Sequence, residues 1–220
     1  MTIDAKDLLN SILESLSRID YIKPEDLPNI DLYMDQVTTF MDSQLAVSKR
    51  HAEDKVLTKT MINNYAKNNL LPPPVKKKYS KEHLLALIFI YYFKNILSIG
   101  DIQEILNPIT DKYFASELDF NLEDIYSEVF RLEKSEVLNL QKDITKKYNT
   151  SQQTFQNISE QISEEEHADL QQFAFICMLS FDVYIKKMLI EKLIDLKVSE
   201  CQKENEQKEK DTKKEQSKKE

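Results

Sequence analysis

A single glycine, Gly100, occurs in the 220 residues of the chain. Sandwiches, barrels and Rossmann sheets depend on tight turns with positive φ, and glycine normally supplies them. Phosphate-cradling loops of the GxGxxG and GxxxxGK[ST] types need more than one glycine and are therefore excluded. The many lysine, glutamate, leucine and isoleucine residues favour helix. The sequence thus predicts an all-α protein and excludes nucleotide-binding enzymes of those two classes.

Cysteine usage and hydropathy indicate the compartment. Cys177 and Cys201 form no CxxC pair, which argues against a zinc site and a disulfide scaffold, and we expect Cys177 to be a small buried hydrophobe. Asp4 and Asp7 stand where a signal peptide carries basic residues. The strongly apolar stretch 173–181 is about half of the roughly 20 residues that span a bilayer. We therefore expect a cytoplasmic protein without membrane contact, bound metal or cofactor.

Charge is distributed unevenly along the chain. The net charge is −8, yet residues 46–81 hold nine basic and two acidic residues, a net charge of +7, so the remainder carries −15. A concentrated basic stretch in an acidic chain is an electrostatic footprint for a polyanion. The alternative is a solvated charged face.

Helical periodicity and prolines divide the chain into four parts. Residues 1–29 contain an amphipathic helix, capped by Asp4, and a proline-containing connector. Residues 30–108 contain the basic stretch, and residues 109–199 contain long helices that we expect to form a dimerisation or effector region. Residues 200–220 lack apolar anchors, which predicts a disordered charged tail.

Capping residues place the individual helices of the two middle parts. Within 30–108 we predict a helix around 37–45, a polar loop over 46–57, a helix over 58–70, a helix opened by Ser80, and a short helix from Ser98 that Pro108 ends. Within 109–199 we predict one helix over 121–147. A second, opened by Ser163, is apolar on most faces from 173 to 194 and must be buried, within the chain or against a second copy.

Residues 58–79 carry a pattern typical of DNA recognition. A helix with a polar face is stopped by Pro72–Pro74, and a short lysine-rich extension over 75–79 follows. This order is typical of a helix-turn-helix followed by a wing, in which the second helix lies in the major groove. Asparagine amides suit adenine edges, while lysines contact guanine edges or clamp phosphates. The predicted DNA-binding residues are Lys59, Asn63, Asn64, Tyr65, Lys67, Asn68, Lys76, Lys77, Lys78 and Tyr79.

Structural interpretations stay open for several of these residues. Asparagines on a polar helix face can simply be solvated. Tyr65 either stacks or hydrogen-bonds at a phosphate, or packs in the core. The triplet Lys76–Lys78 is the strongest indication, because three adjacent like charges repel one another unless a counter-charge arrives.

The stretch TMINNYAKNNLLPPPVKKKYSKEHLLALIFI, followed by ILSIGDIQEIL, resembles the DNA-binding domain of MerR-type transcription regulators. Residues 61–65 fall on the TLRYY recognition helix, 70–73 on GLLPP, 79–80 on the end of the wing, and 97–102 on FSLEEI. The stretch also resembles an uncharacterised bacterial family of unknown function that shares this core. The resemblance implies a winged helix-turn-helix domain followed by a dimerising helix.

Departures from the MerR pattern limit what can be carried over. Asn63 and Asn64 replace the family's arginine and tyrosine, Asn69 stands at its glycine, and residues 46–57 resemble an insertion. Neither sequence preference nor DNA distortion is therefore transferred to this chain.

The function predicted from these features is transcriptional regulation by a homodimer that binds double-stranded DNA and pairs through its C-terminal helices. One alternative is a helical protein–protein adaptor that does not bind DNA. Another is a C-terminal sensor in which aromatic residues such as Phe173, Phe175 and Tyr126 line a small-molecule pocket, although nothing in the sequence identifies an effector. The scattered histidines, His51, His83 and His167, predict no catalytic activity.

Overall fold

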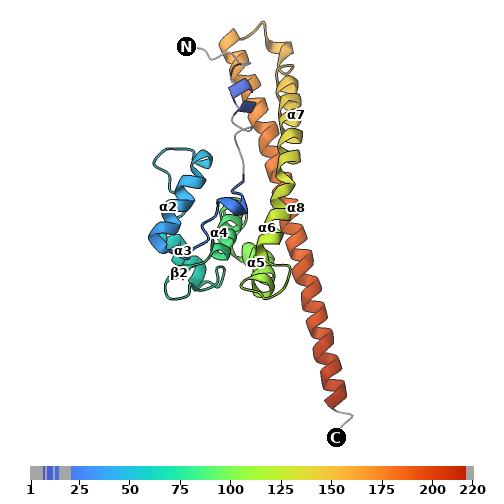
Figure 1. The fold of residues 1–220 in the computed structure, drawn as a ribbon. Helices are drawn as coiled ribbons and strands as arrows, with labels where there is room; N and C mark the ends of the chain where they lie inside the picture. The colour runs from blue at the N-terminus through green and yellow to red at the C-terminus, as the bar shows by residue number, and fades with distance from the viewer. Residues whose placement is uncertain (1–6, 8, 12, 15–20, 217–220) are drawn as a thin grey trace.

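A computed structural model describes residues 7, 9–11, 13–14 and 21–216 of the chain, without the side chains of 133–135, 201–202 and 204–216. The elements run η1 (Pro24–Asp26), β1 (Leu32–Tyr33), α2 (Met34–Gln44), η2 (Ala46–Ser48), α3 (Lys59–Lys67), β2 (Lys78–Tyr79), α4 (Lys81–Phe93), α5 (Ile99–Tyr113), α6 (Leu122–Arg131), α7 (Glu133–Ser151), η3 (Gln156–Ile158) and α8 (Glu164–Gln216) (Figure 1). The described chain is mostly helical, which confirms the all-α prediction.

Helix α4 forms the centre of the main hydrophobic core. Residues 83–91 are buried without interruption, so this helix is apolar on every face and must be covered all round. Helices α2, α3, α5 and α6 lie around it (Figure 1). The short strands β1 and β2 pair antiparallel, with Leu32 opposite Tyr79 and Tyr33 opposite Lys78. This pairing joins the segment before α2 to the segment before α4.

Helices α7 and α8 form a long antiparallel hairpin beside this core (Figure 1). Ile144 of α7 and Phe175 of α8 form a second small core with Leu9 from the N-terminal region. Lys147 of α7 makes an ion pair with Asp143 on the same helix and a second with Asp182 of α8, which ties the two helices together. Beyond the hairpin α8 passes α5 and continues away from the rest of the chain.

Most of the predicted helix starts are confirmed. Thr58 Oγ1 accepts a hydrogen bond of 3.2 Å from the Met61 amide at the start of α3. Ser98, Asn121 and Ser163 cap α5, α6 and α8 in the same way. At the start of α4, Ser80 and His83 form a capping box. The first predicted helix lies partly outside the described residues; residues 7, 9–11 and 13–14 are helical.

The predicted ends of two helices are wrong. Helix α5 continues through Pro108 to Tyr113, because Ile109, Thr110 and Tyr113 extend its apolar face against the core. The helix predicted over 121–147 is two helices, because a tightened turn at Leu132, whose amide bonds to the Val129 carbonyl, separates α6 from α7.

The C-terminal tail also departs from its predicted disorder. Residues 200–216 continue α8 as helix. Lysine, glutamate and glutamine are good helix formers, and these residues extend a helix that is already nucleated.

Candidate nucleic-acid interface

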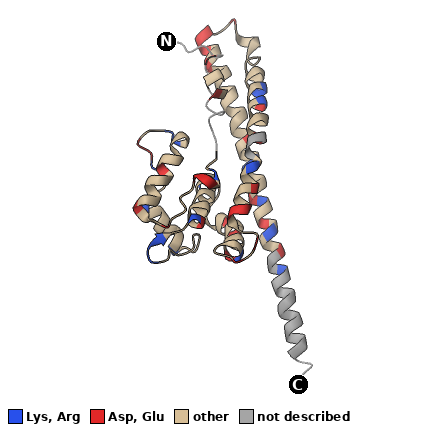
Figure 2. Cartoon of the chain, viewed as in Figure 1, with Lys and Arg blue, Asp and Glu red and all other residues tan. Residues whose placement is uncertain are grey.

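Helix α3 turns a polar face to solvent. Ile62 and Tyr65 are buried against the core, which orients the opposite side of the helix outward. No acidic residue occurs within α3, and lysines lie at its start and end (Figure 2). The exposed residues on this surface are Lys59, Asn63, Asn64, Lys67 and Asn68.

The end of α3 is held by α5. Asn68 Nδ2 donates to the Asn64 carbonyl at 2.8 Å, and Asn69 adopts a left-handed conformation with φ of 54°. The side-chain amide of Gln103 donates to the Asn68 carbonyl. The Asn68 side chain is therefore used to end the helix, which leaves Asn63 and Asn64 as the exposed asparagine side chains in its middle.

A two-residue turn presents Lys76 and Lys77. The Val75 amide donates to the Lys78 carbonyl at 3.1 Å, and the Lys78 amide donates to the Val75 carbonyl at 2.9 Å. Lys76 and Lys77 have φ of 50° and 64°, which is the backbone of a type I′ turn. Such turns favour asparagine and glycine, because a left-handed conformation costs other L-residues about 1–2 kcal/mol each. Both lysine side chains are exposed at the tip.

The residues that follow the turn point partly inward. Lys78 is half-buried, and its ammonium lies 5.4 Å from the centre of the Tyr33 ring. Tyr79 and Tyr65 are both buried, and burial raises the pKa of each phenol. These two predicted site residues therefore belong to the core, which leaves them outside the exposed surface.

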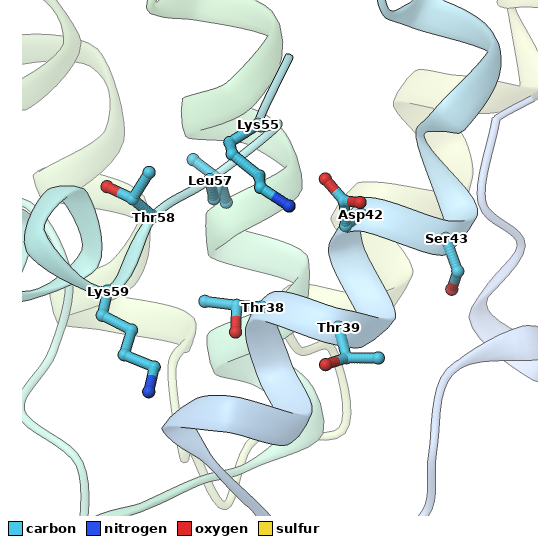
Figure 3. A pocket seen from close by; sticks show the side chains of 8 residues that line it. All are labelled: Thr38, Thr39, Asp42, Ser43, Lys55, Leu57, Thr58 and Lys59. Atoms are coloured by element: carbon cyan, nitrogen blue, oxygen red, sulfur yellow. The ribbon is translucent and has the colours of Figure 1, made fainter. Parts of the chain in front are cut away.

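A cavity of about 450 Å³ adjoins the start of α3. Figure 3 shows its wall, in which α2 contributes hydroxyl groups and the segment before α3 contributes Lys55. Lys59 lines the cavity and forms an ion pair with Asp35. The lining residues are Thr38, Thr39, Asp42, Ser43, Lys55, Leu57, Thr58 and Lys59.

Sequence reasoning missed the contribution of α2 to this surface. The sequence does contain three hydroxyl residues, Thr38, Thr39 and Ser43, shortly before the basic segment that joins α2 to α3. Only the packing of α2 against α3 brings these hydroxyl groups close to Lys55. That connection, residues 45–58, is far longer than the three- or four-residue turn of a standard helix-turn-helix.

The aromatic residues suggested for a C-terminal sensor do not converge. Tyr126 is buried against Phe89 and Phe130, and Phe175 packs edge-on against Tyr148. Phe173 is exposed on α8. Two further findings concern the described residues alone: no group of histidine, cysteine, aspartate or glutamate could hold a metal ion, and no helix is long and apolar enough to cross a membrane.

Comparison with known families identifies part of the chain. Residues 22–129 match the model of a domain of unknown function, DUF1836. No curated protein and no solved structure matches the chain.

This family match shows that the resemblance to MerR-type regulators was wrong, because the domain found over these residues is DUF1836 and nothing indicates a MerR-type family. Two of the segments that carried the resemblance lie at helix ends: residues 70–73 follow the end of α3, and residues 97–102 contain the start of α5. Proline stops and capping residues recur at such positions in unrelated helical proteins.

Proposed function

We propose that this protein binds double-stranded DNA and regulates transcription. In this proposal α2 and α3 act as a helix-turn-helix with an enlarged connection, and the turn at Lys76–Lys77 acts as its wing. Asn63 and Asn64 on α3 read base edges in the major groove, while Lys59 and Lys67 contact phosphates or guanine.

The observation that carries the proposal is the left-handed turn at Lys76 and Lys77. A strained backbone that places two like charges side by side at an exposed tip lowers stability twice, through conformation and through repulsion. Both effects are offset when an anion lies against the tip. A DNA backbone supplies closely spaced phosphates, and lysines that contact them release counterions.

The cavity beside α3 supports an orientation in which the major groove of the duplex lies on α3. Its hydroxyl groups and the ammonium groups of Lys55 and Lys59 are donors suited to phosphate oxygens. A duplex with its major groove on α3 would bring phosphates toward this end of the helix as well as toward the Lys76–Lys77 turn. Phosphate contacts at both places would then fix the register in which Asn63 and Asn64 meet the bases.

We further propose that the protein is a homodimer joined through α8. Phe173, Phe181, Tyr184 and Met188 recur at a spacing that places them on one face of the helix, away from the side where Phe175 packs against α7. Counted on all sides of the helix, the exposed apolar side chains of α8 present on the order of 1,000 Å². They are Phe173, Ile176, Phe181, Val183, Tyr184, Ile185, Met188, Leu189, Ile190, Leu193 and Leu196.

Charge favours an antiparallel pairing of the two α8 helices. The helix begins with Glu164, Glu165, Glu166 and Asp169, whereas residues 186–203 hold five lysines and three acidic residues. A parallel pairing would set the acidic starts against each other. An antiparallel pairing sets each acidic start against the more basic segment of its partner, and a two-fold axis perpendicular to the helices generates this arrangement.

Selection from a pool of randomised duplexes tests the DNA-binding proposal. The full chain is expected to enrich one sequence arranged as an inverted repeat, because two copies related by a two-fold axis meet two half-sites. Recovery of a pool indistinguishable from the input at low salt would contradict the proposal. That result would favour the alternative, a helical adaptor whose α8 face receives a different protein.

A further inference from the structure

A second cavity, of about 340 Å³, lies between η2, the connection that follows it and the end of α4. Neither α3 nor the Lys76–Lys77 turn contributes a residue to its wall, but it shares Lys55 with the first cavity. The lining residues are Ser48, Lys49, Arg50, Asp54, Lys55, Val56, Tyr91, Lys94 and Asn95.

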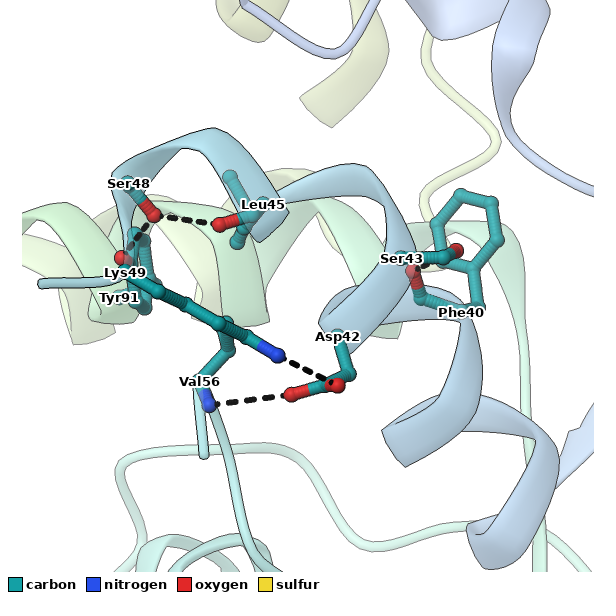
Figure 4. A network of polar contacts seen from close by, with 8 residues as sticks. All are labelled: Phe40, Asp42, Ser43, Leu45, Ser48, Lys49, Val56 and Tyr91. Atoms are coloured by element: carbon teal, nitrogen blue, oxygen red, sulfur yellow. Dashed lines mark hydrogen bonds and ion pairs between the residues drawn. The ribbon is translucent and has the colours of Figure 1, made fainter. Parts of the chain in front are cut away.

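The wall of this cavity is predominantly basic. The Lys49 ammonium is neutralised by Asp42 at 2.7 Å (Figure 4). The Asp54 carboxylate accepts a hydrogen bond from the His51 amide at 3.0 Å. Among the residues that the structure describes, Arg50, Lys55 and Lys94 form no ion pair within 4.0 Å. Lys55 still lies close enough to Asp42 to help lower the pKa of that carboxyl, so Arg50 and Lys94 are the two cations that face the cavity without such a partner.

Lys94 is held in place by neutral groups. Its ammonium donates to the Val56 carbonyl at 2.6 Å and lies 4.9 Å from the centre of the Tyr91 ring. The side chain is half-buried, and this burial lowers the pKa of its amine. Ser48 closes the adjacent wall, where its hydroxyl bonds to the Leu45 carbonyl and to the Tyr91 hydroxyl (Figure 4). A partly desolvated cation is thus fixed at the cavity with no anionic partner.

We propose that this cavity binds a phosphate-bearing anion. Its volume lies within the range of small-ligand sites, roughly 300–1,000 Å³. An arginine guanidinium presents paired donors to phosphate, and two ammonium groups add charge and further donors. An anion between Arg50 and Lys94 supplies the counter-charge that Lys94 otherwise lacks. The phosphate belongs either to a small molecule or to a duplex backbone, and both sources offer the same chemistry to these three residues.

Calorimetric titration of the full chain with inorganic phosphate tests this site. The variants are Arg50→Gln, whose side chain is exposed and supports no described contact, and Lys94→Gln, which removes the charge and keeps a donor for Val56. The matched control is Lys112→Gln, because Lys112 also lies over a tyrosine ring, at 5.0 Å, but on α5 outside the cavity. Each cavity variant should bind phosphate about tenfold more weakly, the loss expected for one hydrogen bond to a charged group, and the control should bind as wild type.

A second titration, in the presence of saturating duplex, separates the two sources. Unchanged phosphate binding supports a small-molecule site, while loss of phosphate binding in wild type supports the same site filled by a backbone phosphate. Absence of phosphate binding at millimolar concentration, or equal binding by Arg50→Gln and wild type, overturns the proposal. Because the first titration contains no DNA, its outcome for wild type and the variants is independent of whether the chain binds a duplex.

Discussion

Val75 and Lys78 exchange both of their backbone hydrogen bonds, at 3.1 and 2.9 Å, and so close a hairpin with two residues at its tip. The pattern fixes positive φ at both tip positions, yet lysine occupies both. A backbone that is unfavourable for lysine therefore coincides with an adjacent pair of exposed charges.

Replacement of Lys76 by asparagine and Lys77 by glycine should raise the stability of the fold and weaken its binding to DNA. Asparagine and glycine are the preferred residues of this turn, so the free energy of unfolding should rise by about 1–2 kcal/mol. DNA affinity should fall, since two phosphate contacts are lost. Urea unfolding and duplex titration measure the two effects, and a variant that is both less stable and fully able to bind DNA would contradict this account of the turn.

Asn63→Ala and Asn64→Ala should relax base preference. A bidentate contact to adenine is worth about 1–3 kcal/mol of discrimination, whereas binding to random duplex should change little. The control is Asn139→Ala, an exposed asparagine on α7. Competition between the selected duplex and a scrambled duplex measures the ratio of the two affinities. If this specificity ratio equals the wild-type value in both variants, α3 does not read the bases through these two residues.

His83 should make the fold sensitive to mild acid. The ring is buried between Tyr79 and Phe114, its Nδ1 accepts from the Ser80 amide at 3.0 Å, and burial lowers its pKa. In the unfolded chain the pKa returns to about 6.5. The unfolded state therefore takes up a proton first as pH falls below that value, and the stability present above it is lost.

His83→Gln tests this pH dependence. Glutamine can still accept from the Ser80 amide in a capping box but does not titrate. Its free energy of unfolding should vary less between pH 7.5 and 5 than that of wild type, measured by urea unfolding. The exposed His51→Gln should keep the wild-type dependence. If the free energy of unfolding varies with pH equally in wild type and His83→Gln, the His83 ring is not the source of the pH dependence.

Phe181→Lys with Tyr184→Lys should convert the proposed dimer to a monomer. Both side chains are 65% exposed, so the change leaves the core intact while placing two like charges at the two-fold interface. Leu118→Lys, at an exposed residue between α5 and α6, is the control. Sedimentation at micromolar concentration gives the mass; a monomeric wild type would refute the dimer without bearing on DNA binding by one copy.

The sequence predicted helix starts well and helix ends poorly. A start is signalled locally, by a capping side chain such as Thr58 or Asn121 that reaches its own backbone. An end depends on packing, so Pro108 did not stop a helix whose later residues still cover the core. The break at Leu132 has no local signal, because the apolar period runs through it.

The candidate site was predicted only where it is local in sequence. The lysine triplet and the asparagines of α3 could be read directly, whereas the burial of Tyr65 and Tyr79 follows from contacts with distant residues. Both cavities combine segments separated along the chain, such as Val56 with Lys94. No spacing rule anticipates such a pair.

The salt dependence of binding to a random-sequence duplex tests the central claim most directly. Fluorescence anisotropy is measured for wild type, for Lys76→Glu with Lys77→Glu, and for the charge-matched control Lys142→Glu with Lys146→Glu on the exposed side of α7. Each phosphate contact contributes about 0.9 to the slope of log affinity against log salt, so the turn variant should lose roughly two units and the control none. Equal slopes for all three proteins, or no binding by wild type at low salt, would contradict the claim that this turn holds DNA.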